Sequence, residues 1–126
     1  MEITRDDQIS GGMELVSQHR EPAQLRSLTN FDWDQVHQFY RYAPGEYIHE
    51  VVGVRIDTGS NYVASDSLLV FKGKGHVVKA VAIDVDRGNL DYQDGQTWSA
   101  DVWLVPREKG DPWGGLRLME PPLSNH

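Results

Sequence analysis

Two aspartates that flank a tryptophan are the first residues whose types and spacing could do chemistry. Asp32 and Asp34 stand on either side of Trp33, so on an extended chain their carboxylates would point the same way, roughly 7 Å apart. Carboxylates at that spacing could share a metal ion or polarise a substrate. The same alternation of acid and aromatic residues also suits the solvent face of an amphipathic strand, so both interpretations stay open.

A second group combines imidazole and carboxylate. Glu46, His49 and Glu50 stand at positions i, i+3 and i+4 of a predicted helix, a spacing that lets the two types of side chain meet one cation. A metal site normally takes ligands from a second element, and His37 is the candidate on the preceding segment. The alternative is the polar face of an amphipathic helix.

No catalytic signature accompanies these candidates. The chain has no nucleophile elbow of the type G-x-S-x-G and no phosphate-binding loop. It has no cysteine, which excludes a disulfide framework, a thiolate nucleophile and a cysteine zinc site. We therefore expect no cofactor, and we expect binding rather than catalysis.

Aromatic residues indicate where binding would occur. Trp98, Trp113 and Tyr92 fall in or beside the late loops and strands of the chain. Exposed tryptophan next to acid is typical of a binding surface, although loop tryptophans also act as lids on a core. The predicted binding residues are the acidic and aromatic side chains Asp32, Trp33, Asp34, Tyr92, Trp98 and Trp113.

The charge balance bears on the class of partner. Twelve Lys and Arg stand against 19 Asp and Glu, a formal net charge of −7. Such a surface repels phosphate backbones and anionic membranes, so we expect no nucleic-acid partner, whereas a basic protein would be attracted. No apolar run approaches the roughly 20 residues that span a bilayer, so no direct membrane span is expected.

Hydrophobic periodicity and turn residues predict an α+β domain. We expect a mainly antiparallel sheet of about five or six strands, with short N-terminal helices and one helix after the first strand. A single domain would span residues 1–126, with flexible tails at 1–12 and 120–126. The predicted elements are two helical pieces within 13–28 divided at Pro22, a strand at 30–40, a helix from Pro44 to Gly53, a strand starting at 54–57, a hairpin at 67–84, an exposed connection at 86–96, and strands at 99–105 and 115–119.

Three segments together carry a resemblance. Residues 30–36 with their F-D-W-D motif, residues 42–48 and the hairpin at 69–78 resemble a pattern in small uncharacterised bacterial proteins, some lipoprotein-like and others immunity-like. The resemblance covers roughly residues 29–84 and carries no catalytic residues across. A lipoprotein-like relative implies a periplasmic or envelope location, but no lipobox cysteine is present, and a cytoplasmic location stays open.

These observations predict a non-enzymatic protein-binding domain, monomeric or weakly self-associating. Inhibition of a basic toxin, as the immunity-like resemblance implies, is its most concrete form. One alternative is a small metal-dependent hydrolase that uses the carboxylates and histidines described above. Another is an envelope-associated assembly lipoprotein whose hairpin edge at residues 67–84 adds to the sheet of a partner.

Overall fold

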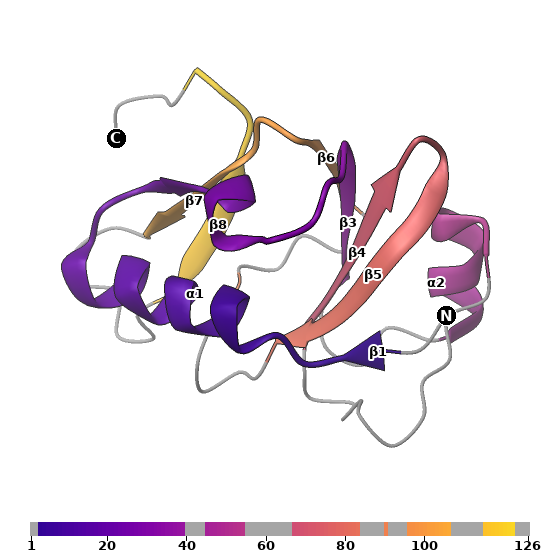
Figure 1. Cartoon of the computed structure of the whole chain (residues 1–126), viewed down its shortest axis with the longest axis horizontal. Helices are drawn as coiled ribbons and strands as arrows, with labels where there is room; N and C mark the ends of the chain where they lie inside the picture. Colours follow the sequence, from indigo (N-terminus) through magenta and orange to yellow (C-terminus); the bar gives the residue numbers. More distant parts are fainter. Residues whose placement is uncertain are drawn as a thin grey trace.

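The computed structural model describes residues 3–39, 45–54, 67–83, 90, 96–106 and 115–122. Within these ranges the chain is α+β, as predicted from the sequence (Figure 1). The elements in chain order are β1 (Ile3–Thr4), α1 (Asp7–His19), β2 (Ala23–Gln24), the 3-10 helix η1 (Leu25–Leu28), β3 (Gln35–Phe39), α2 (Gly45–Val52), β4 (Ser67–Gly73), β5 (His76–Ile83), β6 (Gln96–Ser99), β7 (Trp103–Pro106) and β8 (Leu116–Met119).

The strands form two sheets. A five-stranded sheet has the order β1-β5-β4-β3-β6, and a three-stranded sheet has the order β2-β7-β8. Neighbouring strands run antiparallel except β1, which lies parallel to β5. The predicted antiparallel sheet is therefore present, but the late strands β7 and β8 belong to a separate, smaller sheet.

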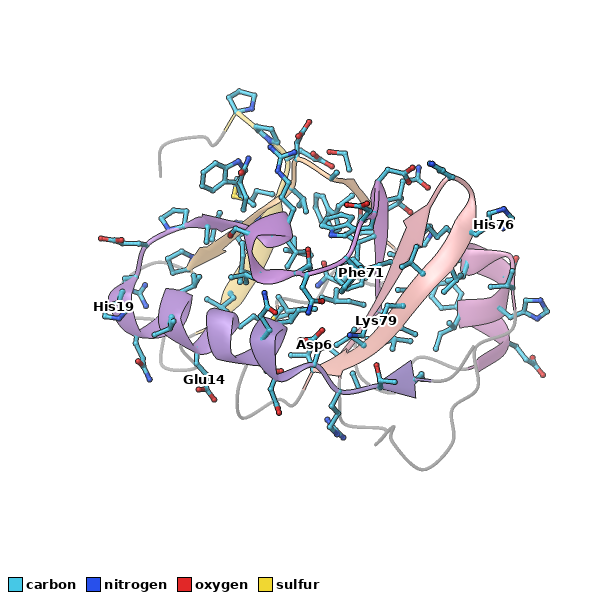
Figure 2. All side chains as sticks on the ribbon, viewed as in Figure 1. Asp6, Glu14, His19, Phe71, His76 and Lys79 are labelled. Atoms are coloured by element: carbon cyan, nitrogen blue, oxygen red, sulfur yellow. The ribbon has the colours of Figure 1, made fainter. Side chains whose placement is uncertain are left out.

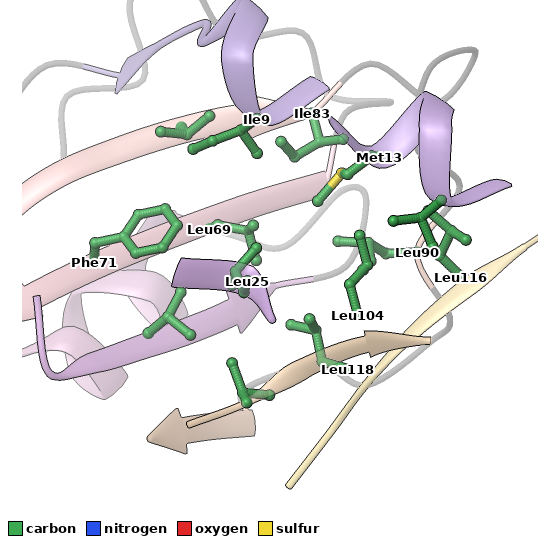
Figure 3. Packing of buried hydrophobic residues seen from close by; sticks show 14 residues of the cluster. Ile9, Met13, Leu25, Leu69, Phe71, Ile83, Leu90, Leu104, Leu116 and Leu118 are labelled. Atoms are coloured by element: carbon green, nitrogen blue, oxygen red, sulfur yellow. The ribbon is translucent and has the colours of Figure 1, made fainter. Parts of the chain in front are cut away.

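The five-stranded sheet has a hydrophobic core on each face. The main core lies between this sheet, α1, η1 and the three-stranded sheet, and Phe71, Met13 and Leu104 are among its buried residues (Figure 3). The second core lies between the opposite face and α2, where Phe39 and Ile48 are buried. Figure 1 shows α1 and α2 on opposite sides of β4 and β5. Because both faces of β4 are covered, most of its residues form a continuous apolar run in the sequence.

The N-terminal segment is not a tail. Residues 3–12 form β1 and the first half of α1, with Ile3 and Ile9 buried, so the predicted flexible tail at residues 1–12 is wrong for this part. The Asp6 side chain caps α1 by accepting a hydrogen bond of 3.1 Å from the Ile9 N–H. Gly12 stands inside the helix because a Cβ there would clash with Leu28 of η1. Close packing thus explains a glycine that would otherwise disfavour a helix.

The prediction of a second N-terminal helical piece, after Pro22, is wrong. Ala23 and Gln24 form a strand that pairs with β7, and only the single 3-10 turn of η1 follows. The Leu25 N–H donates to the Val102 carbonyl at 3.1 Å, which ties this segment to the β6–β7 connection. Pairing with a distant strand therefore overrides the local helix propensity after Pro22.

Two locally encoded elements are confirmed. Helix α2 buries Ile48 and Val52 and is followed by Gly53, whose φ of 88° is the left-handed conformation of a helix stop. The hairpin β4–β5 turns at Lys74 and Gly75, with φ values of 53° and 80°. Positive φ at both positions is the geometry of a two-residue hairpin turn that matches the strand twist.

Two predicted strands have different bounds. β3 covers only residues 35–39 of the predicted strand at 30–40, and residues 30–34 are irregular. The predicted strand at 99–105 is interrupted because the Val102 N–H donates to the Ser99 carbonyl at 3.2 Å, which ends β6 and starts a turn into β7. β8 pairs back on β7 as predicted. The predicted strand start at 54–57 and the connection at 86–96 lie mostly outside the described residues.

The C-terminal segment is tethered at its start. Glu120, expected to begin the flexible tail at 120–126, accepts a hydrogen bond of 2.7 Å from the Ser99 hydroxyl and another from the Ser99 N–H. This contact joins the end of β8 to the end of β6. Neither described helix has the length and apolar character needed to cross a bilayer.

Candidate functional site

Two aromatic residues of the F-D-W-D motif close over the main core. The rings of Phe31 and Trp33 meet the ring of Phe71 edge to face, with centroid distances of 5.1 Å and 5.0 Å. Phe71 is completely buried on β4. The segment before β3 is therefore a flap over Phe71, which explains why residues 30–34 leave the sheet.

Hydrogen bonds fix this flap at both ends. The Trp33 indole N–H donates to the Thr29 hydroxyl at 3.0 Å, and that hydroxyl donates to the Arg26 carbonyl at 2.9 Å. At the other end, the Asp34 N–H donates to the Lys72 carbonyl at 2.8 Å. The flap is thus attached to η1 on one side and to β4 on the other.

The two motif aspartates have different roles. Asp34 accepts a hydrogen bond of 3.0 Å from the Lys74 N–H and so caps the β4–β5 turn. Asp32 is exposed and makes no hydrogen bond or ion pair with the described part of the chain. The predicted pair of carboxylates on one strand face is therefore wrong, because the segment is not a strand and one carboxylate serves the hairpin.

Asp32 lies at the edge of a surface hollow of about 470 Å³. The Arg26 guanidinium stands in this hollow and pairs with Asp101 at 3.5 Å, with both side chains more than half exposed. The lining residues come from η1, the flap and the β6–β7 turn: Arg26, Thr29, Asn30, Phe31, Asp32, Trp33 and Ala100.

A partly buried ion pair lies next to the flap. The Lys79 ammonium lies 2.8 Å from Asp6 Oδ2 and 5.1 Å from the Phe31 ring centroid, and Figure 2 shows Asp6 and Lys79 together near Phe71. Burial opposes the charged form of Asp6, but Lys79 and the N–H groups at the start of α1 outweigh it, so the pKa of Asp6 lies below its ordinary value. The helix cap and the flap are thus linked through one carboxylate.

Trp98 serves the core rather than a free surface. It lies half-buried on β6, packs against the main core, and donates its indole N–H to Gln38 Oε1 at 3.1 Å. This confirms the alternative that a late tryptophan covers the sheet. Tyr92 and Trp113, the other two predicted binding residues, lie outside the described part of the chain.

The candidate metal ligands do not come together. His37 is 6% exposed on β3, the strand between β4 and the edge strand β6, with Nδ1 at 2.9 Å from the Thr97 hydroxyl. Glu46, His49 and Glu50 all lie on the exposed side of α2. Among the residues with described positions, no three His, Asp or Glu side chains are grouped so that they could hold a metal ion. Burial, and then the charge of Lys72, lower the pKa of His37.

The hairpin does not offer the open edge that strand addition would need along its whole length. β4 lies inside the sheet between β3 and β5, and β1 covers the outer side of β5 at Ala80 and Val81. The structure therefore gives no direct support to the predicted hairpin edge at residues 67–84.

Comparisons with known protein families, with curated proteins and with solved structures find no match. The sequence pointed to Asp32 and Trp33, which line the hollow, but not to Arg26, Asn30 or Ala100. Thr29 and Asn30 are turn-forming residues directly before the motif, and that is the signal that could have indicated a flap.

Proposed function

We propose that this chain is a non-enzymatic protein-binding domain whose hollow beside Asp32 receives a basic side chain of a protein partner. The observation that carries the proposal is that Asp32, alone among the four residues of the motif, makes no hydrogen bond, ion pair or ring contact with the residues that the structure describes. Phe31 and Trp33 cover Phe71, and Asp34 caps the hairpin turn. An exposed acid on a segment fixed by its neighbours is suited to recognition.

The local charge favours a cationic group in this hollow. Arg26 is the cation of the lining, and its charge is offset by Asp101 at 3.5 Å. Asp32 is the carboxylate among the lining residues, and it forms no ion pair with the described part of the chain. The net charge of −7 over the whole chain adds a field of the same sign, which would speed the encounter with a basic partner.

Rigid aromatic side chains beside Asp32 add to the proposal. Phe31 and Trp33 line the hollow while their rings are held against Phe71. A cation is attracted to aromatic rings, as Lys79 already is to the Phe31 ring at 5.1 Å. Because these side chains are ordered before binding, their own loss of conformational entropy on contact with a partner would be small. An inhibitor of a basic toxin is the concrete form of this function.

A peptide selection tests the proposal. We expect random peptides displayed on phage and selected on the purified chain to be enriched in Lys and Arg. For one selected peptide, the Asp32→Asn variant should raise the dissociation constant about tenfold, the effect of losing one charged partner. The matched control is Glu50→Gln, which removes the same charge from the exposed side of α2, on the opposite face of the sheet.

Two outcomes would contradict the proposal. One is a selection that yields peptides with no basic preference. The other is an equal loss of affinity in the Asp32→Asn and Glu50→Gln variants, which would show that only the net charge matters and that the hollow is not the site.

A further inference from the structure

Strand β6 is the edge of the five-stranded sheet beside β3. It pairs with β3 from Gln35 to Gln38, and no other strand of the described ranges pairs with its outer side. Gln96, Thr97 and Ser99 are exposed, so Trp98 is the residue of β6 that packs against the main core. The attachment of β6 therefore depends on its hydrogen bonds to β3 and on the packing of a single side chain.

Two side-chain contacts join β6 to β3, one on each face of the sheet. On the face of the main core, Trp98 donates to Gln38 at 3.1 Å. On the face of the second core, the Thr97 hydroxyl lies 2.9 Å from His37 Nδ1, and the two residues are direct partners in the strand register. The second contact involves a group that changes its charge at mildly acidic pH.

The surroundings of His37 suit only its neutral form. The ring is buried, and Nε2 has no hydrogen-bond partner among the residues that the structure describes. In the neutral ring Nδ1 can carry the proton toward Thr97 while Nε2 stays a bare acceptor. Protonation would place an N–H and a positive charge at a buried atom with no acceptor beside it, which is costly.

The charged groups that the structure describes around this face do not relieve that cost. Lys72 lies two residues beyond Val70, the β4 partner of His37, and its positive charge opposes a second one. On α2, Tyr47 packs against Phe39, and Glu46, His49 and Glu50 are exposed. On β6, Thr97 and Ser99 are neutral, and Glu120 is engaged by Ser99 at the end of the strand.

We propose that β6 is a pH-sensitive edge strand: below about pH 6.5, where a solvated histidine takes up a proton, charging of His37 separates β6 from β3 and exposes the edge of β3 at Gln35–Gln38. This proposal rests on the contacts between β3 and β6 and does not depend on the proposed function. The freed edge of β3 would carry unpaired N–H and C=O groups that another strand could bind.

Hydrogen exchange of the full chain, followed by mass spectrometry between about pH 7.5 and 5.5 and corrected for intrinsic rates, tests this proposal. Exchange in β6 and β3 should rise by up to about tenfold for each pH unit below about 6.5, the slope for one linked proton. Exchange in the paired region of β4 and β5 should not change. The rise should disappear in His37→Gln and persist in the control His76→Gln, which alters an exposed histidine of β5.

A second measurement on the unmodified chain applies even if His37→Gln does not fold. NMR titration should give a His37 pKa below the ordinary histidine value of about 6.5, with the resonances of β6 changing in step. The proposal is overturned if all strands exchange faster together, if the rise persists in His37→Gln, or if the exchange of β6 does not depend on pH.

Discussion

Replacing Phe71 by leucine should cost more stability than the same change at Phe39. Both phenylalanines are completely buried on the five-stranded sheet, so the change in volume and the loss of apolar contact are similar. Phe71 meets two rings edge to face, those of Phe31 and Trp33, whereas Phe39 meets only the ring of Tyr47 among the described residues. Each such contact contributes about 0.5–1.5 kcal/mol beyond burial.

The ring contacts alone therefore predict a loss of about 1–3 kcal/mol for Phe71→Leu and about 0.5–1.5 kcal/mol for Phe39→Leu. A double-mutant cycle of Trp33→Leu with Phe71→Leu isolates one contact. Its coupling energy should be about 0.5–1.5 kcal/mol, which exceeds the scatter of about 0.3–0.5 kcal/mol for independent sites.

Urea unfolding followed by tryptophan fluorescence and circular dichroism measures all four species of the cycle. The comparison requires equal m-values, because a changed m-value would indicate a change in the unfolded or native ensemble. The reasoning is refuted if the effects of Trp33→Leu and Phe71→Leu add to within about 0.3 kcal/mol. The contact between Trp33 and Phe71 would then add nothing to the free energy of unfolding.

Two further predictions concern the segments that hold the flap. Asp6→Asn keeps an oxygen for the Ile9 N–H but removes the charge paired with Lys79, and should cost about 1 kcal/mol at neutral pH in chemical unfolding. The pKa of Asp6 is lowered in the folded protein. The difference in free energy of unfolding between the unmodified protein and Asp6→Asn should therefore shrink as the pH falls below about 4 and the carboxylate takes up a proton. A difference that does not change at low pH would contradict this. Lys74→Asn should raise the free energy of unfolding by about 0.5–1 kcal/mol, because asparagine before Gly75 suits the positive φ of this turn better than lysine. Thermal unfolding measures this effect. A lower midpoint of thermal unfolding in the variant would show that the Lys74 side chain has another role.

The parts of the fold that the sequence predicts correctly are encoded by neighbouring residues. Helix α2 follows from an apolar stripe that ends at Gly53, and the hairpin follows from two β-rich runs around Lys74 and Gly75. Such signals need no partner from elsewhere in the chain. The pairing of β8 with β7 is likewise between strands that follow each other in the chain.

The parts predicted wrongly are determined by distant partners. Ile3 is a strand residue because it pairs with Ala80, and Ala23 is extended because it pairs with Leu104. No local pattern contains those pairings. The residue types of the motif drew attention to Asp32 and Asp34, but the role of Asp34 depends on the N–H of Lys74, 40 positions later.

The hollow also depends on contacts between distant segments of the chain. Its walls come from η1, the flap and the β6–β7 turn, and a hydrogen bond from the Leu25 N–H to the Val102 carbonyl joins η1 to that turn. The sequence alone could therefore indicate an acidic and aromatic motif, but not the arginine that lines the same hollow. The alternation of acidic and aromatic residues is equally typical of a strand, and only the packing of Phe31 and Trp33 on Phe71 distinguishes a flap from a strand.

The free energies of unfolding of Asp32→Ala and Asp34→Ala, measured side by side, test the central claim most directly. Asp34→Ala removes the acceptor for the Lys74 N–H and should cost about 1 kcal/mol, whereas Asp32→Ala should stay within about 0.5 kcal/mol of the unmodified protein. That result would leave Asp32 available for a partner. Equal losses in both variants would show that Asp32 also holds the fold, and would contradict the assignment of Asp32 to binding.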